Sequence, residues 1–174
     1  MIYYLADTHF GDGRVMMLAK RPFSEVEEMN RALIERWNRR VSSADDVYIL
    51  GDFAVSDAVA CEILPLLNGR KHLIVGNHDS ALTTSLTAFE SVSQLQRIDD
   101  NGRCVVLCHY PLLSYENSIY GGYQVFGHIH NNPDDIATRF VRQLSRSLHA
   151  GADMTGFAPK TLDELIAMKE DESN

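Results

Sequence analysis

The chain has 174 residues, of which 45% are hydrophobic and 23% are charged, and its formal net charge is −8. This composition is typical of one globular domain and excludes a disordered or fibrous chain. The negative charge argues against binding to long nucleic acids, and no apolar segment approaches the roughly 20 residues of a membrane-spanning helix.

In chain order, predicted strands and helices alternate in the first part of the sequence. Short apolar runs rich in β-branched and aromatic residues predict buried strands over 2–6, 47–50 and 73–75. Between them, apolar residues recur at helical spacing, which predicts helices over 24–38 and 56–67. This order indicates an α/β protein in which crossover helices connect neighbouring strands.

Capping signals mark two helix starts. Ser24 with Glu27 predicts a capping box for the first helix. Thr161 with Glu164 predicts another for a last helix over 161–169.

The second part of the chain is richer in strands. Apolar runs at 105–108 and 123–126 predict two more buried strands, and the Asp-Asn-Gly sequence at 100–102 predicts a hairpin turn. No repeat or linker divides the sequence. We therefore expect a single domain over 1–169, followed by a short acidic tail over 170–174.

Potential metal ligands follow every one of the five predicted strands. They are carboxylates, an amide and imidazoles: Asp7, His9, Asp52, Asn77, His109, His128 and His130. Functional groups gather at the carboxyl ends of strands in helix-covered sheets, so we expect these side chains to meet in one crevice. Each motif alone could equally have a structural role. However, five of the seven histidines fall in these segments. The combination predicts a metal site.

The spacing of these residues supports chelation. Asp7 with His9, and His128 with His130, are two residues apart, so at an extended strand end both members point the same way. A glycine directly precedes three candidate ligands, where we expect sharp turns in a conformation that other residues resist. Oxygen and imidazole donors without cysteine favour Mn²⁺, with Fe, Zn²⁺ or Ni²⁺ as alternatives.

The ordered pattern D-x-H, G-D, G-N-H-D, H and G-H-x-H over residues 7–130 resembles the calcineurin-like metallophosphoesterases. The Arg-Pro-Phe segment at 21–23 and the His-Tyr-Pro segment at 109–111 resemble their compact bacterial and phage members. The resemblance implies the metallo-dependent phosphatase fold, a four-layer α/β/β/α sandwich of two mixed β-sheets flanked by helices. One departure is Asp12, where similar compact members carry histidine.

The resemblance also implies two metal ions that share one bridging ligand, Asp52. The other ligands of the first ion would be Asp7, His9 and His130. Those of the second ion would be Asn77, His109 and His128.

A hydroxide held between the two ions is the expected nucleophile. His78 is expected to stabilise the phosphoryl group and protonate the leaving oxygen, with Asp79 orienting its imidazole. The alternative for His78 is a structural histidine beside the site.

These features predict a dinuclear metal-dependent phosphoric ester hydrolase, acting on mono- or diesters of small phosphorylated or nucleotide-like molecules. Two alternatives stay open: a nuclease acting on short nucleic acid, and a non-catalytic metal-binding interaction module. Four tyrosines in or beside one predicted loop would either stack on a nucleobase or pin the loop: Tyr110, Tyr115, Tyr120 and Tyr123.

The sequence also predicts a cytoplasmic location. No basic stretch precedes an apolar segment at the N-terminus, so we expect no export signal. Cys61, Cys104 and Cys108 lack a paired C-x-x-C spacing, which is typical of reduced thiols in a reducing compartment.

Overall fold

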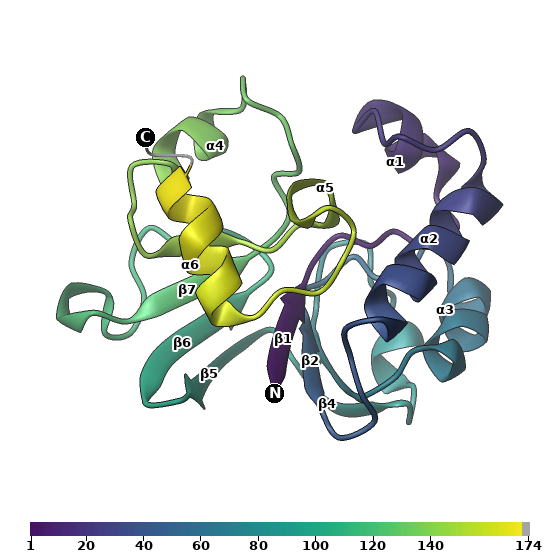
Figure 1. The fold of residues 1–174 in the computed structure, drawn as a ribbon, viewed down its shortest axis with the longest axis horizontal. Helices are drawn as coiled ribbons and strands as arrows, with labels where there is room; N and C mark the ends of the chain where they lie inside the picture. The colour runs from purple at the N-terminus through teal and green to yellow at the C-terminus, as the bar shows by residue number, and fades with distance from the viewer. Residues whose placement is uncertain (172–174) are drawn as a thin grey trace.

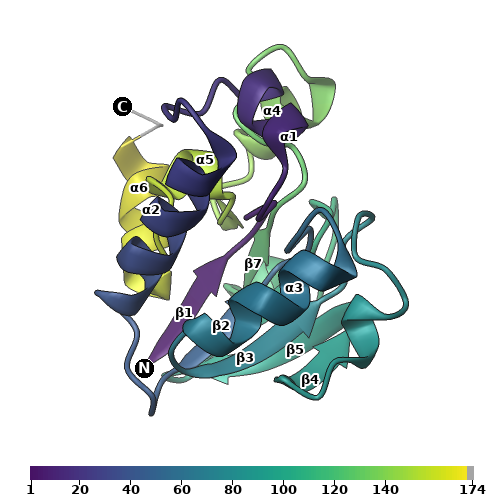
Figure 2. The ribbon, with the colours of Figure 1, turned by 90° about the vertical axis from the view of Figure 1, so that its right-hand side faces the viewer.

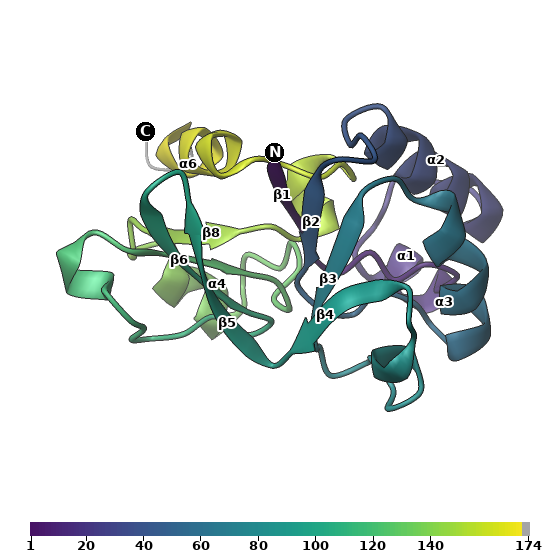
Figure 3. The ribbon, with the colours of Figure 1, turned by 90° about the horizontal axis from the view of Figure 1, so that it is seen from below.

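The computed structural model describes residues 1–171, and within them the chain forms two four-stranded sheets. The first sheet has the order β1-β2-β3-β4, and its strands are Ile2–Leu5, Asp46–Ile49, Arg70–Ile74 and Phe89–Ser93. The second has the order β5-β6-β7-β8, and its strands are Leu95–Asp100, Arg103–Cys108, Tyr123–Phe126 and Ser147–His149. Figure 3 shows the two sheets with β4 running into β5.

The five strands predicted from the sequence are confirmed as β1, β2, β3, β6 and β7. The sequence does not predict β4, β5 or β8. β4 and β5 are edge strands with several exposed residues, so their segments lack a continuous apolar run. β8 has only three residues, which is too short to stand out as a pattern.

Most of the strands run in parallel. All neighbours in the first sheet are parallel, as are β6, β7 and β8, whereas β5 is antiparallel to β6. The β5–β6 turn has Asn101 at φ 55° and Gly102 at φ 80°, which confirms the predicted two-residue hairpin turn. Within each sheet, the carboxyl ends of the parallel strands therefore lie at the same edge.

Six α-helices connect and cover these strands in the described part of the chain. They are α1 (Gly13–Leu18), α2 (Val26–Asn38), α3 (Asp57–Ile63), α4 (Ile136–Val141), α5 (Ala152–Thr155) and α6 (Leu162–Asp171). The three predicted helices are confirmed as α2, α3 and α6. However, α3 passes into a 3₁₀ turn at Leu64–Leu66, because Pro65 has no N–H to continue the α-helical hydrogen bonds.

One of the two predicted capping boxes is wrong. Ser24 is bound by Glu28 rather than Glu27: the Ser24 N–H and Oγ both donate to Glu28 Oε2, at 2.8 and 2.6 Å. The second box is confirmed, because the Thr161 N–H donates to Glu164 at 2.9 Å and the Glu164 N–H donates to Thr161 Oγ1 at 3.4 Å.

Three hydrophobic clusters hold helices and sheets together. In the first, Trp37 of α2 and Ile49 of β2 pack between the first sheet and its helices. In the second, Tyr4 of β1 and Val125 of β7 pack where the two sheets meet, together with residues of α6. In the third, Val141 of α4 packs on β7. Figures 1 and 2 show α2 and α3 covering the first sheet and α4 and α6 lying with the second, as the α/β class predicts.

The two sheets are joined at the carboxyl end of β1. The Ala6 N–H donates to the Ala150 carbonyl at 2.8 Å, and the Ala152 N–H donates to the Ala6 carbonyl at 2.8 Å. The resulting parallel bridge between Ala6 and Gly151 brings the ends of β1 and β8 together. The strand ends of both sheets therefore converge on one side of the molecule.

Two further predictions concern membrane-spanning helices and the acidic C-terminal tail. Every helix within residues 1–171 is too short or too polar to cross a membrane. Glu170 and Asp171, the start of the expected acidic tail, are the last residues of α6, whereas residues 172–174 lie outside the described part. The single domain over 1–169 stays a prediction.

We predict that Trp37→Ala lowers the free energy of unfolding by about 3–5 kcal/mol, because it removes a fully buried ring and opens a cavity. The same change removes the indole hydrogen bond to the Asn68 carbonyl, at 3.0 Å. Urea denaturation measures the loss, and Met17→Ala, at a side chain 70% exposed, is the control expected to change stability by less than about 0.5 kcal/mol. A Trp37→Ala loss below about 1 kcal/mol would contradict this assignment of the core.

Candidate metal centre

Left-handed backbone turns occur at five of the seven predicted ligands. The φ angles are 54° at Asp7, 47° at His9, 54° at Asp52, 73° at His128 and 47° at His130. Residues with a Cβ rarely adopt this region, and each such turn costs on the order of 1–3 kcal/mol. The prediction that the two-residue pairs point the same way because their backbone is extended is therefore wrong. The backbone turns sharply at these positions, and these turns set the directions of the ligand side chains.

The glycines beside the ligands have two different roles. Gly51 has φ 84°, as the sequence predicted for a sharp turn. Gly76 and Gly127 lack this conformation, and their requirement is space: a Cβ at Gly76 would collide with the Asp52 carboxylate, and one at Gly127 would lie 2.5 Å from Asp7 Oδ2. Close packing against ligand carboxylates, rather than backbone conformation, excludes side chains at these two positions.

One group of potential ligands comprises Asp7, His9 and His130. One donor atom from each lies within 4.8 Å of the others. Asp7 and His9 are buried, and His9 Nε2 is buried without a hydrogen-bond partner. A buried nitrogen left unpaired costs free energy unless something else binds its lone pair. This nitrogen points to a ligand that the protein side chains do not supply.

A second group comprises Asp7, Asp52 and His109, again with donor atoms within 4.8 Å. His109 Nδ1 lies 2.7 Å from the Leu50 carbonyl and donates to it, which leaves Nε2 facing the site. Asn77 Oδ1 lies 3.1 Å from that Nε2.

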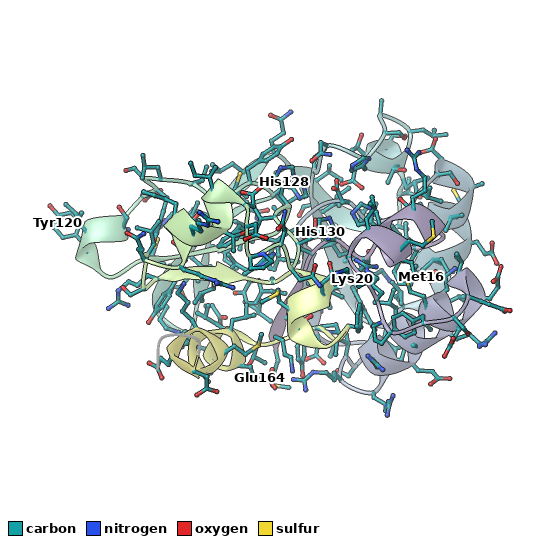
Figure 4. The ribbon with its side chains drawn as sticks, turned by 90° about the horizontal axis from the view of Figure 1, so that it is seen from above. Met16, Lys20, Tyr120, His128, His130 and Glu164 are labelled. Atoms are coloured by element: carbon teal, nitrogen blue, oxygen red, sulfur yellow. The ribbon has the colours of Figure 1, made fainter. Side chains whose placement is uncertain are left out.

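The two histidines after β7 lie in different surroundings. The His128 ring packs 5.1 Å from the His109 ring, whereas the His130 ring packs 5.3 Å from His9. Figure 4 shows His128 and His130 near the centre of the molecule. The two rings therefore contact different neighbours, and the binding of one cation by the pair stays a prediction.

The Asp52 carboxylate, a member of the second group, also faces the first group. Its Oδ2 is 3.6 Å from His9 Nε2 and 3.5 Å from His109 Nε2. His9 follows β1 in the first sheet and His109 follows β6 in the second, so one oxygen faces an imidazole from each sheet. Its other oxygen, Oδ1, accepts the His78 backbone N–H at 2.8 Å. This position suits a ligand shared by two cations.

Burial shifts the pKa values of three of these groups towards their uncharged forms. Burial raises the pKa of Asp7 to about 8 and lowers the pKa of His9 to about 4. Burial also lowers the pKa of His128. Neutral imidazoles are the form that binds metals, and a nearby divalent cation supplies the positive charge that an ionised buried carboxylate requires.

Asp79 holds the turn at Asp52. Its Oδ2 accepts the backbone N–H groups of Asp52 at 3.0 Å and Gly76 at 2.8 Å, and its Oδ1 accepts that of Phe53 at 3.0 Å. Both oxygens therefore hold the loop that carries Asp52, and the orientation of the His78 imidazole by Asp79 stays a prediction. His78 itself is exposed, with its ring 5.5 Å from the His9 ring.

Two residues that hold candidate ligands in position, Asp153 and Arg21, were not predicted from the sequence to do so. Asp153 Oδ2 lies 2.7 Å from His130 Nδ1, and its Oδ1 accepts the Arg21 Nε–H at 2.7 Å. Burial lowers the pKa of His130, but the hydrogen bond to Asp153 and the charges of Asp7 and Asp153 together raise that pKa overall. Arg21 also donates to the carbonyls of Asp7 at 2.7 Å and Thr8 at 2.8 Å. Asp153 thus orients an imidazole, and Arg21 braces the strained turn at Asp7.

A weak signal for Asp153 exists in the sequence. It follows Gly151 just after β8, as other polar site residues follow their strands, but β8 itself is too short to predict. Arg21 belongs to the Arg-Pro-Phe segment that resembles compact family members, but its contacts with the carbonyls of Asp7 and Thr8 and with Asp153 have no local signal in the sequence. Asp12, the departure from the compact family members, caps α1 through the N–H groups of Arg14 and Val15, and lies 3.8 Å from His9 Nδ1.

Of the four tyrosines near one loop, Tyr110 is the one that lies at the site. Its ring packs 4.6 Å from the His128 ring. Tyr115 donates to the carbonyls of Gly122 and Arg146, both at 3.3 Å, and so pins the loop. Tyr120 is 83% exposed and lies at the far end of the molecule from His128 (Figure 4), which excludes it from stacking on a ligand at this site.

The fold and the site define the chain as an α/β protein with a candidate metal centre, and comparison with known proteins places it in a family. No protein-family model matches the chain. The uncharacterized protein MJ1445 of Methanocaldococcus jannaschii is 34% identical over 172 residues, which cover 97% of this chain and 91% of that protein. The chain belongs to the same family as MJ1445. The gene 66 protein of mycobacterium phage L5 is 28% identical over 184 residues, with 88% and 87% covered.

Solved structures support the fold. The crystal structure of AQ665, a protein of unknown function from Aquifex aeolicus, matches with a TM-score of 0.77 and 21% identity, covering 97% of this chain and 98% of that one. This likeness shows a shared fold. The Pseudomonas putida nuclease MPE matches with a TM-score of 0.49 and 19% identity, covering 74% of this chain and 61% of that one, and this carries no argument about function.

We predict that Asp153→Asn weakens the binding of Mn²⁺ by about 10- to 100-fold, because the amide no longer fixes the orientation and charge of His130. Isothermal titration calorimetry measures this affinity. Asp163→Asn is the matched control, since Asp163 pairs with Arg103 at an exposed position and should bind Mn²⁺ as the unmodified protein does. Unchanged affinity in folded Asp153→Asn would contradict the positioning role.

Removal of the Asp52 carboxylate should lower the metal content of the protein itself. Asp52→Ala removes the oxygen that faces both imidazoles, so we expect both bound ions to be lost, whereas Asn77→Ala should reduce binding at the second position alone. Elemental analysis after dialysis against Mn²⁺ measures the stoichiometry. The same metal content in Asp52→Ala and the unmodified protein would contradict the ligand assignment.

Proposed function

We propose that the chain is a dinuclear metal-dependent phosphoric ester hydrolase that cleaves mono- or diesters of small phosphorylated molecules. One observation carries the proposal: a single buried carboxylate oxygen of Asp52 faces an unpartnered imidazole nitrogen of His9 on one side and His109 on the other. The three hydrophobic clusters support the finer proposal of a four-layer α/β/β/α sandwich, with α2 and α3 outside one sheet and α4 outside the other.

The donor set fits two divalent cations. Asp52 would bind both of them. The first would also be held by Asp7, His9 and His130. The second would also be held by Asn77, His109 and His128. Bound divalent ions lower the pKa of water and stabilise negative charge on phosphoryl oxygens. Carboxylate, amide and imidazole donors without cysteine favour Mn²⁺, with Fe, Zn²⁺ or Ni²⁺ as alternatives.

The residues of the chain supply the rest of the chemistry. His78 is exposed beside His9, and its backbone is fixed by the Asp52 carboxylate, so its imidazole can donate a proton to a leaving oxygen at the edge of the site. Asp79 keeps the Asp52 turn in place through three backbone N–H groups. Arg21 and Asp153 hold Asp7 and His130 in position.

A small substrate agrees with the charge of the chain. The formal charge of −8 opposes a long nucleic acid, whereas two bound cations would attract one phosphate locally. Three free cysteines support the proposal of a cytoplasmic location. A nuclease acting on short nucleic acid is the second candidate from the sequence, and competition by oligonucleotides with steep salt dependence would favour it.

The test of this function is hydrolysis of p-nitrophenyl phosphate and bis-p-nitrophenyl phosphate by chelator-stripped protein, with Mn²⁺, Ni²⁺, Zn²⁺ or Mg²⁺ added back. We expect turnover that depends on the metal and is lost in Asp52→Ala. The ratio of the two rates separates monoester from diester preference. Metal-loaded protein that hydrolyses neither ester would favour the non-catalytic binding module.

We predict that His78→Ala keeps its metal content but loses about 10²-fold or more in kcat, as expected when a positioned acid is removed. Elemental analysis and steady-state kinetics on the same preparation separate the two effects. His72→Ala is a matched histidine control, because His72 lies 3.0 Å from Asp46 on β2 and outside the site. Full activity in metal-replete His78→Ala would contradict the role of His78.

A further inference from the structure

An apolar trough lies beside the metal centre. Its cavity is about 320 Å³, and its walls come from the segment after β6 and from α4: Pro111, Leu112, Leu113, Ile136, Ala137 and Phe140. Leu113 is 73% exposed, Ile136 84% and Phe140 44%. Exposure of such large apolar side chains to water is unfavourable. A concave patch of them is typical of a binding surface. The residues that line the trough are different from those assigned to the hydrolytic site.

The trough adjoins a cleft that contains two of the candidate ligands. A cleft of about 820 Å³ contains His128 and His130 and extends along the segment that leads into α4. Ala137 lines both this cleft and the trough. On the opposite wall, Tyr110 packs on His128 and is followed directly by Pro111. Both cavities have volumes in the range of small-molecule sites, about 300–1,000 Å³.

One wall of the trough is held rigidly. The side-chain amide of the buried Gln124 accepts the Leu112 N–H at 2.8 Å and donates to the Leu112 carbonyl at 2.7 Å. The same amide donates to Ser147 Oγ at 2.7 Å, which ties the wall to β8. Facing it, Ile136 and Phe140 lie one helical turn apart on α4. Hydrogen bonds thus fix the backbone of one wall, and side chains of α4 form the other.

The residues that line the trough are all apolar, and the charged residues lie in the neighbouring cleft. There Lys20 shares the lining with Asp134 and Asp135; Asp134 lies 3.5 Å from Arg139, and Asp135 accepts the Ala137 N–H at 2.7 Å. A phosphate or other charged group would find no polar partner among the side chains of the trough, whereas an uncharged hydrocarbon group gains from burial there.

From this adjacency and the apolar lining we infer that the trough binds the apolar moiety of the substrate, so that the ester cleaved at the candidate metal centre is a phosphorylated amphiphile with an alkyl or similar hydrocarbon group. The inference rests on the proposed function. The phosphate would lie beside His128 and His130, and the hydrocarbon chain would pass Ala137 into the space between Leu112 and Phe140.

Non-hydrolysable alkylphosphonates test the trough by binding alone. Calorimetric titration of Mn²⁺-loaded protein with methyl-, butyl- and hexylphosphonate should give affinities that rise roughly threefold per added methylene, because each methylene is removed from water. Ile136→Ser and Phe140→Ser should flatten this dependence. Ile136 is highly exposed, so its substitution leaves the fold intact, and Ile119→Ser, at a residue 83% exposed outside the trough, should keep the full dependence.

The outcomes separate the inference from the proposed function. Equal affinities for the three phosphonates, with p-nitrophenyl phosphate still hydrolysed, would overturn the trough and leave the hydrolase standing. A dimer in sedimentation that Ile136→Ser dissociates would assign the trough to a second copy of the chain and also overturn the inference. Absence of both phosphonate binding and hydrolysis in metal-loaded protein would overturn both proposals.

Discussion

The buried carboxylate of Asp52 is the point around which the site is built. One of its oxygens faces imidazole nitrogens of His9 and His109, which follow strands of different sheets, and the other accepts the His78 backbone N–H. Its own backbone is held by Asp79. A buried carboxylate needs hydrogen-bond partners or nearby positive charge to offset its loss of hydration. The imidazole nitrogens of His9 and His109 that face this oxygen are the candidate co-ligands of a cation beside it.

The turns that bring the strand ends together are strained, which lowers the stability of the fold. Five ligands adopt left-handed turns, and Gly76 and Gly127 leave no room for a side chain against the ligand carboxylates. This strain is offset by the three hydrophobic clusters and by hydrogen bonds to the strained backbone. Arg21, which is buried, donates to the carbonyls of Asp7 and Thr8 and binds Asp153. The core thus provides the free energy that keeps the strand ends in an otherwise unfavourable conformation.

Much of this architecture could be predicted from the sequence, because buried parallel strands read as continuous apolar runs and a polar residue ends each of them. That logic located β1, β2, β3, β6 and β7 and the metal-ligand candidates after them. It failed where the signal is not local. Edge strands β4 and β5 are half exposed, β8 is three residues long, and Arg21 acts through backbone carbonyls.

Residue spacing alone does not fix the directions of the side chains at the candidate site. His128 and His130 are two residues apart, yet a left-handed turn at each sends one ring towards His109 and the other towards His9. Asp79 follows His78 in the chain, yet its carboxylate turns to the backbone of Asp52 and Phe53. Short-range spacing fixes a side-chain direction only when the backbone conformation is known.

The most direct measurement for the central claim is a crystal structure of the Mn²⁺-soaked protein with anomalous diffraction data. We predict two anomalous peaks about 3.5–4 Å apart, on either side of the Asp52 carboxylate. One peak should lie beside His9 and His130 and the other beside His109 and His128. A single peak, or peaks away from Asp52, would contradict the dinuclear centre on which the proposed function depends.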